Sequence, residues 1–178
     1  MSTIDPPLVR RFVELAVKRL EGHWIIIGGA VLPLIGVDHR VTLDIDVAGP
    51  PEARMEQLLV LLKIAKELSL PVEAINQAGA IFLEGVTGFE NHLIPVASTD
   101  RCTFSRPDAT LYILLKIPRL SESDLEDCLR YLDYCRSQGE APENERLIAA
   151  IQDAIANAVP ARAERLRALL PVLGPPVT

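Results

Sequence analysis

The spacing of hydrophobic residues along the 178-residue chain predicts helices at both ends and short strands between them. Over residues 6–20, apolar side chains recur every three or four positions among charged ones, which is typical of an amphipathic helix. The same spacing predicts a second long helix over residues 52–70. Further helices are expected over residues 107–117, 123–136, 142–157 and 160–170. For the helix that begins near residue 123, Ser123 and Glu126 have the spacing of a capping box.

Short runs rich in β-branched residues predict the strands. Residues 24–27 (WIII) form a continuous apolar run, as in a strand that is covered on both faces, and Gly28-Gly29 stops it. A short helix at residues 30–34 and a second strand at residues 40–47 are expected to follow. Shorter strands are expected near residues 72–75, 80–83, 92–97 and 101–104.

The strand expected at residues 40–47 combines an apolar face with an ionised one. Successive side chains of a strand point to opposite faces, so Arg40, Thr42, Asp44 and Asp46 share one face. Asp44 and Asp46 then lie about 7 Å apart along the strand, which allows both carboxylates to converge on one cation. Taken alone, such a pair is more often a solvated face than a metal site.

The glycine pair that ends the first strand suggests a chemistry of its own. Because Gly28 and Gly29 have no Cβ, their backbone amides can approach a phosphate closely at the start of the helix. Taken alone, a glycine pair is more often a tight turn. Magnesium is the hard cation that binds carboxylates and phosphate oxygens together, so the two motifs would jointly suit a nucleoside triphosphate.

Composition limits the classes of function. The chain has 49% hydrophobic and 24% charged residues and a net charge of −6, which provides no basic field for nucleic acid. Its three cysteines form no CxxC pair and no even set, and they are expected to be reduced thiols in a cytoplasmic protein. No apolar run approaches the roughly 20 residues that span a bilayer, so no membrane association is expected.

Two patches of the sequence resemble a known superfamily. Gly28-Gly29-Ala30 and the later RVTLDID, residues 40–46, are similar to the glycine-pair and Asp-x-Asp signature of the DNA polymerase beta-like nucleotidyltransferases. The arginine and threonine before the acidic pair most resemble an uncharacterised bacterial branch, related to the nucleotidyltransferases of abortive-infection and toxin–antitoxin systems. Lys116 and the SDLED of residues 123–127 are similar to the lysine and the Asp-x-x-Asp element that close the domain in that branch.

The resemblance implies roles for individual residues. Asp44 and Asp46 would hold magnesium and form the catalytic set with a third carboxylate from a later strand. Glu73, Glu84 and Glu90 are available for that third position, and we select Glu84. The residues implied in substrate binding are Gly28, Gly29, Arg40, Thr42 and Lys116.

Lys116 and the acidic element after it also have a structural interpretation, which we favour over the functional one. The lysine can extend its ammonium to solvent from its own helix. Asp124 and Asp127 suit the beginning of a helix by their charge alone.

The resemblance implies an α+β (α/β) fold, with a nucleotidyltransferase-like mixed sheet flanked by helices in residues 1–139. Residues 140–178 would form a helical C-terminal extension packed on it. The implied activity is magnesium-dependent transfer of a nucleoside monophosphate from a triphosphate to a hydroxyl acceptor, in a toxin–antitoxin or phage-defence setting. The alternative is a catalytically inactive module that binds a nucleotide or a protein partner. Nucleic acid is expected only as an acceptor.

Overall fold

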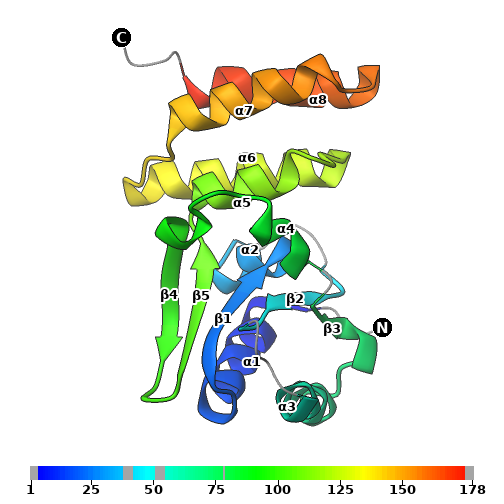
Figure 1. Ribbon diagram of the computed structural model, residues 1–178, viewed down its shortest axis with the longest axis vertical. Coiled ribbons are helices and arrows are strands. Elements are labelled where there is room, and N and C mark those ends of the chain that lie inside the picture. Colours follow the sequence, from blue (N-terminus) through cyan, green and yellow to red (C-terminus); the bar gives the residue numbers. More distant parts are fainter. Residues whose placement is uncertain (1–3, 38–41, 51–54, 78, 175–178) are drawn as a thin grey trace. The chain divides into compact units, whose positions relative to one another are not determined.

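Figure 1 shows the computed structural model, which describes residues 4–37, 42–50, 55–77 and 79–174. The chain divides into two compact units, Met1–Pro107 and Asp108–Thr178. The first unit contains a mixed five-stranded sheet with flanking helices, and the second unit is helical. The expected α+β class, with a mixed sheet, flanking helices and further helices at the C-terminal end, is confirmed.

The sheet of the first unit has the strand order β3-β2-β1-β5-β4. Its strands are β1 (Gly22–Ile27), β2 (Ile45–Ala48), β3 (Ile75–Asn76), β4 (Leu93–Ser98) and β5 (Cys102–Pro107). β1 lies in the centre, antiparallel to β2 and parallel to β5. β3 runs parallel to β2, and β4 is antiparallel to β5.

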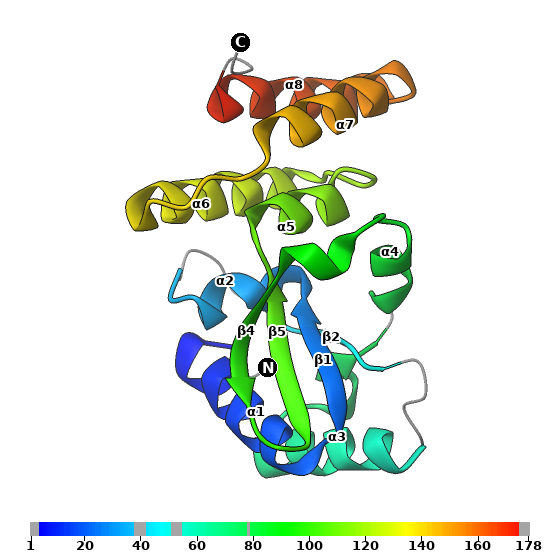
Figure 2. The same cartoon turned by 60° about the vertical axis from the view of Figure 1, so that its left-hand side comes forward.

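The helices of this unit are α1 (Pro6–Arg19), α2 (Val31–Leu34), α3 (Met55–Glu67) and α4 (Ala80–Glu84). Short 3₁₀ turns lie at Gly28–Ala30, Val72–Ala74 and Phe89–His92. α1 begins where the carboxylate of Asp5 accepts a hydrogen bond of 2.9 Å from the backbone N–H of Leu8, which satisfies one of the free amides of the first turn. α1 packs beside β4 and β5, as Figure 2 shows.

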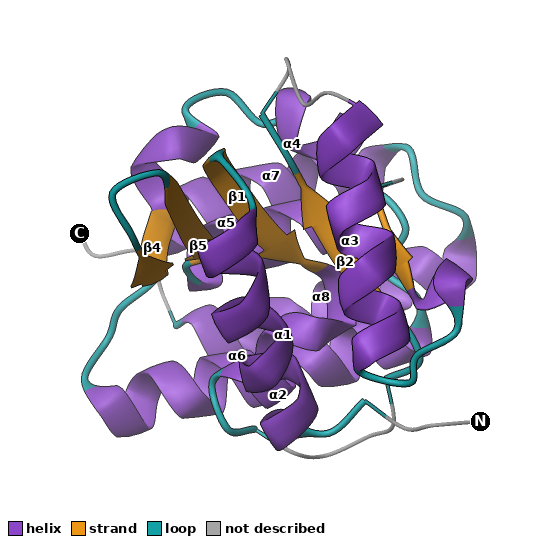
Figure 3. Cartoon of the chain, turned by 90° about the horizontal axis from the view of Figure 1, so that it is seen from below, coloured by secondary structure: helices purple, strands orange, loops and turns teal. Residues whose placement is uncertain are grey.

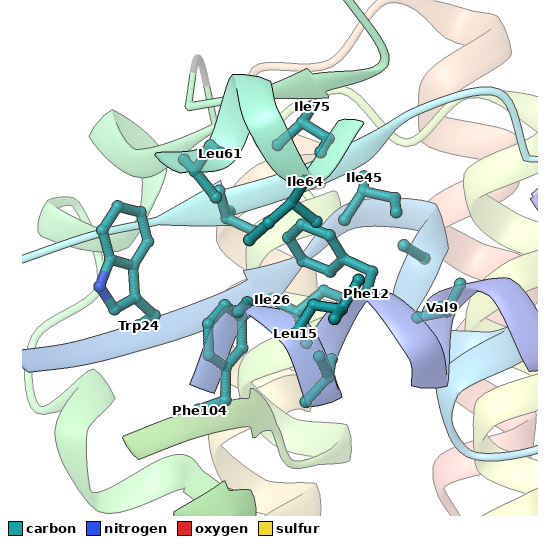
Figure 4. Packing of buried hydrophobic residues seen from close by; sticks show 14 of the residues in the cluster. Val9, Phe12, Leu15, Trp24, Ile26, Ile45, Leu61, Ile64, Ile75 and Phe104 are labelled. Carbon is teal, nitrogen blue, oxygen red and sulfur yellow. The ribbon is translucent and has the colours of Figure 1, made fainter. Parts of the chain in front are cut away.

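One face of the sheet forms the hydrophobic core with α1 and α3. Figure 3 shows α1 and α3 on one face of the sheet. Trp24 and Ile26 of β1 and Phe104 of β5 are fully buried in this core (Figure 4). Val47 of β2 is fully buried in it as well. The Trp24 and Phe104 rings stack with their centroids 6.4 Å apart. The odd-numbered residues of β1 therefore point to the opposite face, because side chains alternate along a strand.

The second unit consists of α5 (Ala109–Lys116), α6 (Glu122–Gln138), α7 (Asn144–Ala156) and α8 (Pro160–Leu173). Its core is formed by aliphatic residues of all four helices, among them Ile113, Leu132, Leu147, Ile151 and Leu166. α6 ends at Gly139, whose positive φ of 70° allows the chain to leave the helix. The division of the chain at residue 139 into a domain and an extension stays a prediction.

The structure corrects several expected boundaries. Residues 80–83, expected as a strand, lie in helix α4, and β2 covers only the last part of the strand expected at 40–47. α6 has Ser121 as its N-cap, not Ser123, and Asp124, not Glu126, bonds back to the cap. Each of the two serines is followed three residues later by an acidic residue, so the spacing alone does not show which of them is the N-cap. Within the described residues, no helix has the length and apolar content of a membrane span.

Replacing Ile26 tests the buried face of the sheet. Ile26 is 0% exposed, whereas Ile81 on α4 is 69% exposed. We expect Ile26→Ala to lower the free energy of unfolding by about 2–5 kcal/mol, since it leaves a cavity in the core. The same change at Ile81 should alter it by less than about 0.5 kcal/mol. Urea unfolding of both variants measures the difference, and equal losses would contradict the assignment of the core.

Candidate functional site

Asp46 lies on the face of the sheet opposite the core. Its neighbours on β2, Ile45 and Val47, are 0% exposed, whereas Asp46 itself is partly exposed. In register it is paired with Ile27 of β1 and with Asn76 of β3. Residues paired in register share a face of the sheet, so these three side chains lie on the same side. The predicted alternation of β2 is confirmed over residues 45–47.

The glycine pair and Asp46 meet at the end of β1. Gly28 follows Ile27 directly and has a positive φ of 69°, a conformation that side chains with a Cβ rarely adopt. A Cβ added at Gly28 would overlap with a carboxylate oxygen of Asp46 and lie 3.2 Å from its Cγ. Gly28 is therefore required both for the turn of the backbone and for its close approach to the acid. Gly28 and Gly29 open the 3₁₀ turn that leads into α2.

A third glycine approaches the same place and was not expected from the sequence. A Cβ at Gly79 would lie 2.6 Å from Cδ1 of Ile27 and 4.0 Å from Cβ of Asp46. The chain thus passes close over the sheet beside Asp46 just before α4. In the sequence, Gly79 resembles the other glycines that separate short strands, so nothing distinguished it.

The other residues expected at this site lie in different environments. Asp44 is exposed and precedes β2 by one residue. Thr42 is 6% exposed, and its backbone carbonyl accepts a hydrogen bond of 3.0 Å from the N–H of Ile4. Leu43 is 47% exposed, so the expected alternation of an apolar and a polar face is wrong at residues 42–43. The reason is that β2 begins only at Ile45, and Thr42 joins Ile4 through an isolated bridge instead.

Two further expected residues lie away from the strands or outside the described part. Glu84, selected as the third carboxylate, is the exposed last residue of α4. Arg40 lies outside the described residues. Their roles at the site stay predictions, as does that of Thr42.

In the second unit, Lys116 is enclosed by two buried carboxylates. Its ammonium donates hydrogen bonds of 2.9 Å to Asp124 and 2.8 Å to Asp127, and all three side chains are less than one-tenth exposed. It also lies 5.0 Å from the centre of the Tyr112 ring. The structural interpretation expected the lysine to extend to solvent, and this is wrong, because Lys116 is buried with its two carboxylate partners. These contacts favour a structural role for Lys116, and a contact with phosphate stays a prediction.

Asp124 is the centre of this network. Arg119 donates to it through Nε and Nη2, each at 2.8 Å, and the backbone N–H of Ser121 donates at 2.9 Å. Burial raises the pKa of Asp124, but the hydrogen bonds from Arg119, the charge and hydrogen bond of Lys116 and the hydrogen bonds from Ser121 outweigh it. The pKa of Asp124 is therefore held well below its usual value.

The donor atoms around Asp46 suit a hard divalent cation. Carboxylate and amide oxygens are the ligands that magnesium and calcium prefer, and the carboxylate of Asp46 lies directly against the backbone of Gly28. Within the described part of the chain, no three His, Cys, Asp or Glu side chains come together as a metal-binding group. A cation here would be held by Asp46, by Asp44 and by oxygen atoms that do not belong to a further acidic side chain.

Residues 8–132 of the chain match a protein family described as "Nucleotidyltransferase of unknown function (DUF6036)". The chain belongs to this family. No curated protein and no solved structure matches it. The matched region contains the glycine pair, both aspartates of the Asp-x-Asp motif, and Lys116 with its partners Asp124 and Asp127. Membership of the polymerase beta-like superfamily and of its toxin–antitoxin branch stays a prediction.

Alanine at Gly28 tests the contact with Asp46. Gly139 provides a matched control, because its φ of +70° is the same and nothing lies within 4 Å of an added Cβ. Both Gly→Ala changes should cost about 1–2 kcal/mol for the left-handed backbone. Gly28→Ala should cost up to about 1 kcal/mol more, since the carboxylate of Asp46 must rotate away from the new Cβ.

Urea unfolding measures both variants. Adding Asp46→Ala to Gly28→Ala should remove the excess, because the carboxylate is then gone. An excess that persists in the double variant would show that another group, not Asp46, limits the space at Gly28.

The lowered pKa of Asp124 predicts a loss of stability in acid. A carboxylate whose folded pKa is lowered stabilises the protein above its unfolded pKa, near 3.8, and loses that effect as the pH falls toward the folded value. Asp124→Asn should lower the free energy of unfolding by about 3 kcal/mol at pH 7, because Lys116 and Arg119 lose a buried partner. The difference from the wild type should shrink steadily below about pH 4.

Asp133→Asn is the control, since Asp133 lies on the same helix and is 63% exposed in its ion pair with Arg136. It should change stability by less than about 1 kcal/mol at any pH. Chemical unfolding between pH 2 and pH 7 compares the three proteins. A constant difference between wild type and Asp124→Asn would contradict the lowered pKa.

Proposed function

We propose that this nucleotidyltransferase moves a nucleoside monophosphate from a nucleoside triphosphate to a hydroxyl acceptor, with magnesium as its cation. The contact between Gly28 and the carboxylate of Asp46 is the observation that carries the proposal. This contact places the backbone of a glycine, which has no side chain, directly beside a carboxylate on a partly exposed part of the sheet. The chain also belongs to a nucleotidyltransferase family. A phosphate bound by the backbone amides of the glycine pair would lie next to a cation bound by the carboxylate of Asp46.

In this proposal, the two aspartates bind the cation and the glycine pair binds the triphosphate. Asp46, held in register between β1 and β3, provides a fixed carboxylate, and Asp44 provides an exposed one two residues earlier. The backbone amides of Gly28 and Gly29 can donate to phosphate oxygens, because no side chain blocks them. Magnesium would neutralise the charge of the phosphates and of the departing pyrophosphate.

In the proposed reaction, the hydroxyl oxygen of the acceptor forms a bond to the α-phosphorus of the triphosphate. The bond between the α-phosphorus and the bridging oxygen breaks, pyrophosphate leaves with the electron pair, and the hydroxyl proton is released to solvent. The protein positions the two reactants, which is the main contribution that phosphoryl transfer requires.

The charge of the chain supports the need for a cation. The protein has a net charge of −6, so it repels a triphosphate at long range. A divalent cation that arrives with the nucleotide removes much of this repulsion. The acceptor is proposed as a hydroxyl of a protein, an RNA or a small molecule, in a toxin–antitoxin or phage-defence setting. That setting rests on the resemblance of the motifs alone.

Transfer of label from triphosphates tests the proposal. Incubation of the full chain with α-labelled nucleoside triphosphates, magnesium and cell extract should give a labelled product that disappears with a chelator. Asp46→Asn should reduce the rate at least about 100-fold, equivalent to about 2.7 kcal/mol, because the cation loses a charged ligand.

Asp133→Asn, an exposed acid on α6, is the control and should label as the wild type does. Equal labelling by wild type and Asp46→Asn would contradict the proposal. Magnesium-dependent binding of a non-hydrolysable triphosphate without any transfer would instead support the alternative, an inactive nucleotide-binding module.

A further inference from the structure

The strand beside β2 carries an oxygen ligand next to Asp46. Asp46 has two partners in register, Ile27 on β1 and Asn76 on β3. Ile27 has no polar atom in its side chain, whereas Asn76 has an amide oxygen. Asn76 is partly exposed, as Asp46 is, and it lies on the same face of the sheet.

We propose that Asn76 is a ligand of the cation, and that its Oδ1 takes the place where a third carboxylate was expected. This inference rests on the proposed function, because it names the remaining donor of the same site. The set is then two carboxylates, Asp44 and Asp46, and one neutral amide.

The geometry of the sheet favours this assignment. Neighbouring strands lie about 4.8 Å apart, so two side chains in register start from backbones at that distance. Side chains of Asp and Asn on such backbones can turn their oxygens toward one cation, which both residues would then hold. The ladder between β2 and β3 keeps the two backbones in place.

Asn76 fits the position better than Glu84 does. Glu84 is the exposed last residue of helix α4 and belongs to no strand of the sheet. Asn76 is fixed beside Asp46 by the pairing of Asp46 with Asn76 and of Ile45 with Ile75. Ile75 is 9% exposed and belongs to the core cluster, so its burial fixes which face Asn76 occupies.

An amide ligand has an electrostatic consequence that can be measured. Two carboxylates that lie side by side repel each other, most strongly where water is excluded. The neutral Asn76 avoids a third such charge, but it also attracts the cation less than a carboxylate would. Cation affinity should therefore rise when Asn76 becomes an acid and fall when residue 76 loses its amide oxygen, and the fall is the change that a merely structural asparagine would not cause.

Binding of Mn²⁺ to the full chain, followed by the electron paramagnetic resonance of the free ion, tests the inference. Asn76→Ala should weaken Mn²⁺ binding about tenfold, and Asn76→Asp should strengthen it about tenfold, since ligand number and charge set the affinity. Asn91→Ala, which alters an exposed asparagine of the Phe89–His92 turn, should bind as the wild type does. Asp46→Asn should lose most of the binding.

The outcomes separate the two proposals. If Asn76→Ala binds Mn²⁺ as the wild type does while Asp46→Asn loses it, Asn76 is not a ligand and the proposed function stands. If the wild type binds no Mn²⁺, either alone or with a non-hydrolysable triphosphate, both the inference about Asn76 and the proposed function are wrong. If Asn76→Ala does not fold, Asn76→Leu decides, because its side chain has nearly the same shape as asparagine and no oxygen.

Discussion

The pairing of β1 with its two neighbours is the constraint on which the candidate site depends. β1 is hydrogen-bonded to β2 on one side and to β5 on the other. Its even-numbered residues, Trp24 and Ile26, are locked into the core with α1 and α3, and this fixes which face Ile27 occupies. Ile27 is paired with Asp46, so the same packing directs the carboxylate away from the core. A slip of one residue between β1 and β2 would turn Asp46 into the core and Val47 out of it.

The sequence predicted the parts of this arrangement that local patterns determine. An apolar run that ends at two glycines predicts β1 and its turn, and alternation at residues 45–47 predicts the face of Asp46. The contact between Gly28 and Asp46 could be inferred only from the resemblance to the nucleotidyltransferase signature. The sequence of a single strand does not indicate which strand it pairs with. The strand expected at residues 40–47 is wrong at residues 42–44 for the same reason. Thr42 pairs with Ile4, a partner that is 38 positions away in the chain.

Residues 75–84 show where sequence patterns cannot decide. β3 has two residues and α4 has five, which is too short for a period of 2.0 or 3.6 to be recognised. Asn76 has no features in the sequence that distinguish it from an asparagine in a loop. Only its register with Asp46 makes it a candidate ligand. Gly79 is similar, since its close approach to Ile27 and Asp46 is a property of the folded chain.

The Lys116 network shows that a motif can be explained by folding as well as by catalysis. A buried ammonium costs several kcal/mol unless carboxylates surround it, and Asp124 and Asp127 do so from one side of α6. Arg119 supplies the second positive charge, so two bases and two acids balance. The spacing from Lys116 to Asp124 and Asp127 is what a lysine at the end of α5 needs in order to be buried against α6. The motif therefore supports membership of the family without requiring a contact with substrate.

The proposed donor set also bears on how an acidic protein accepts an acidic substrate. Two carboxylates neutralise a divalent cation, whereas three would leave the occupied site with a net charge of −1. A triphosphate carries several negative charges, and it is attracted more strongly by a neutral site than by an anionic one. With Asn76 as the third ligand, the site would hold its cation less firmly before the nucleotide arrives and repel the nucleotide less once it does. Such a site favours a cation that enters together with the triphosphate, which is consistent with a chain whose net charge is −6.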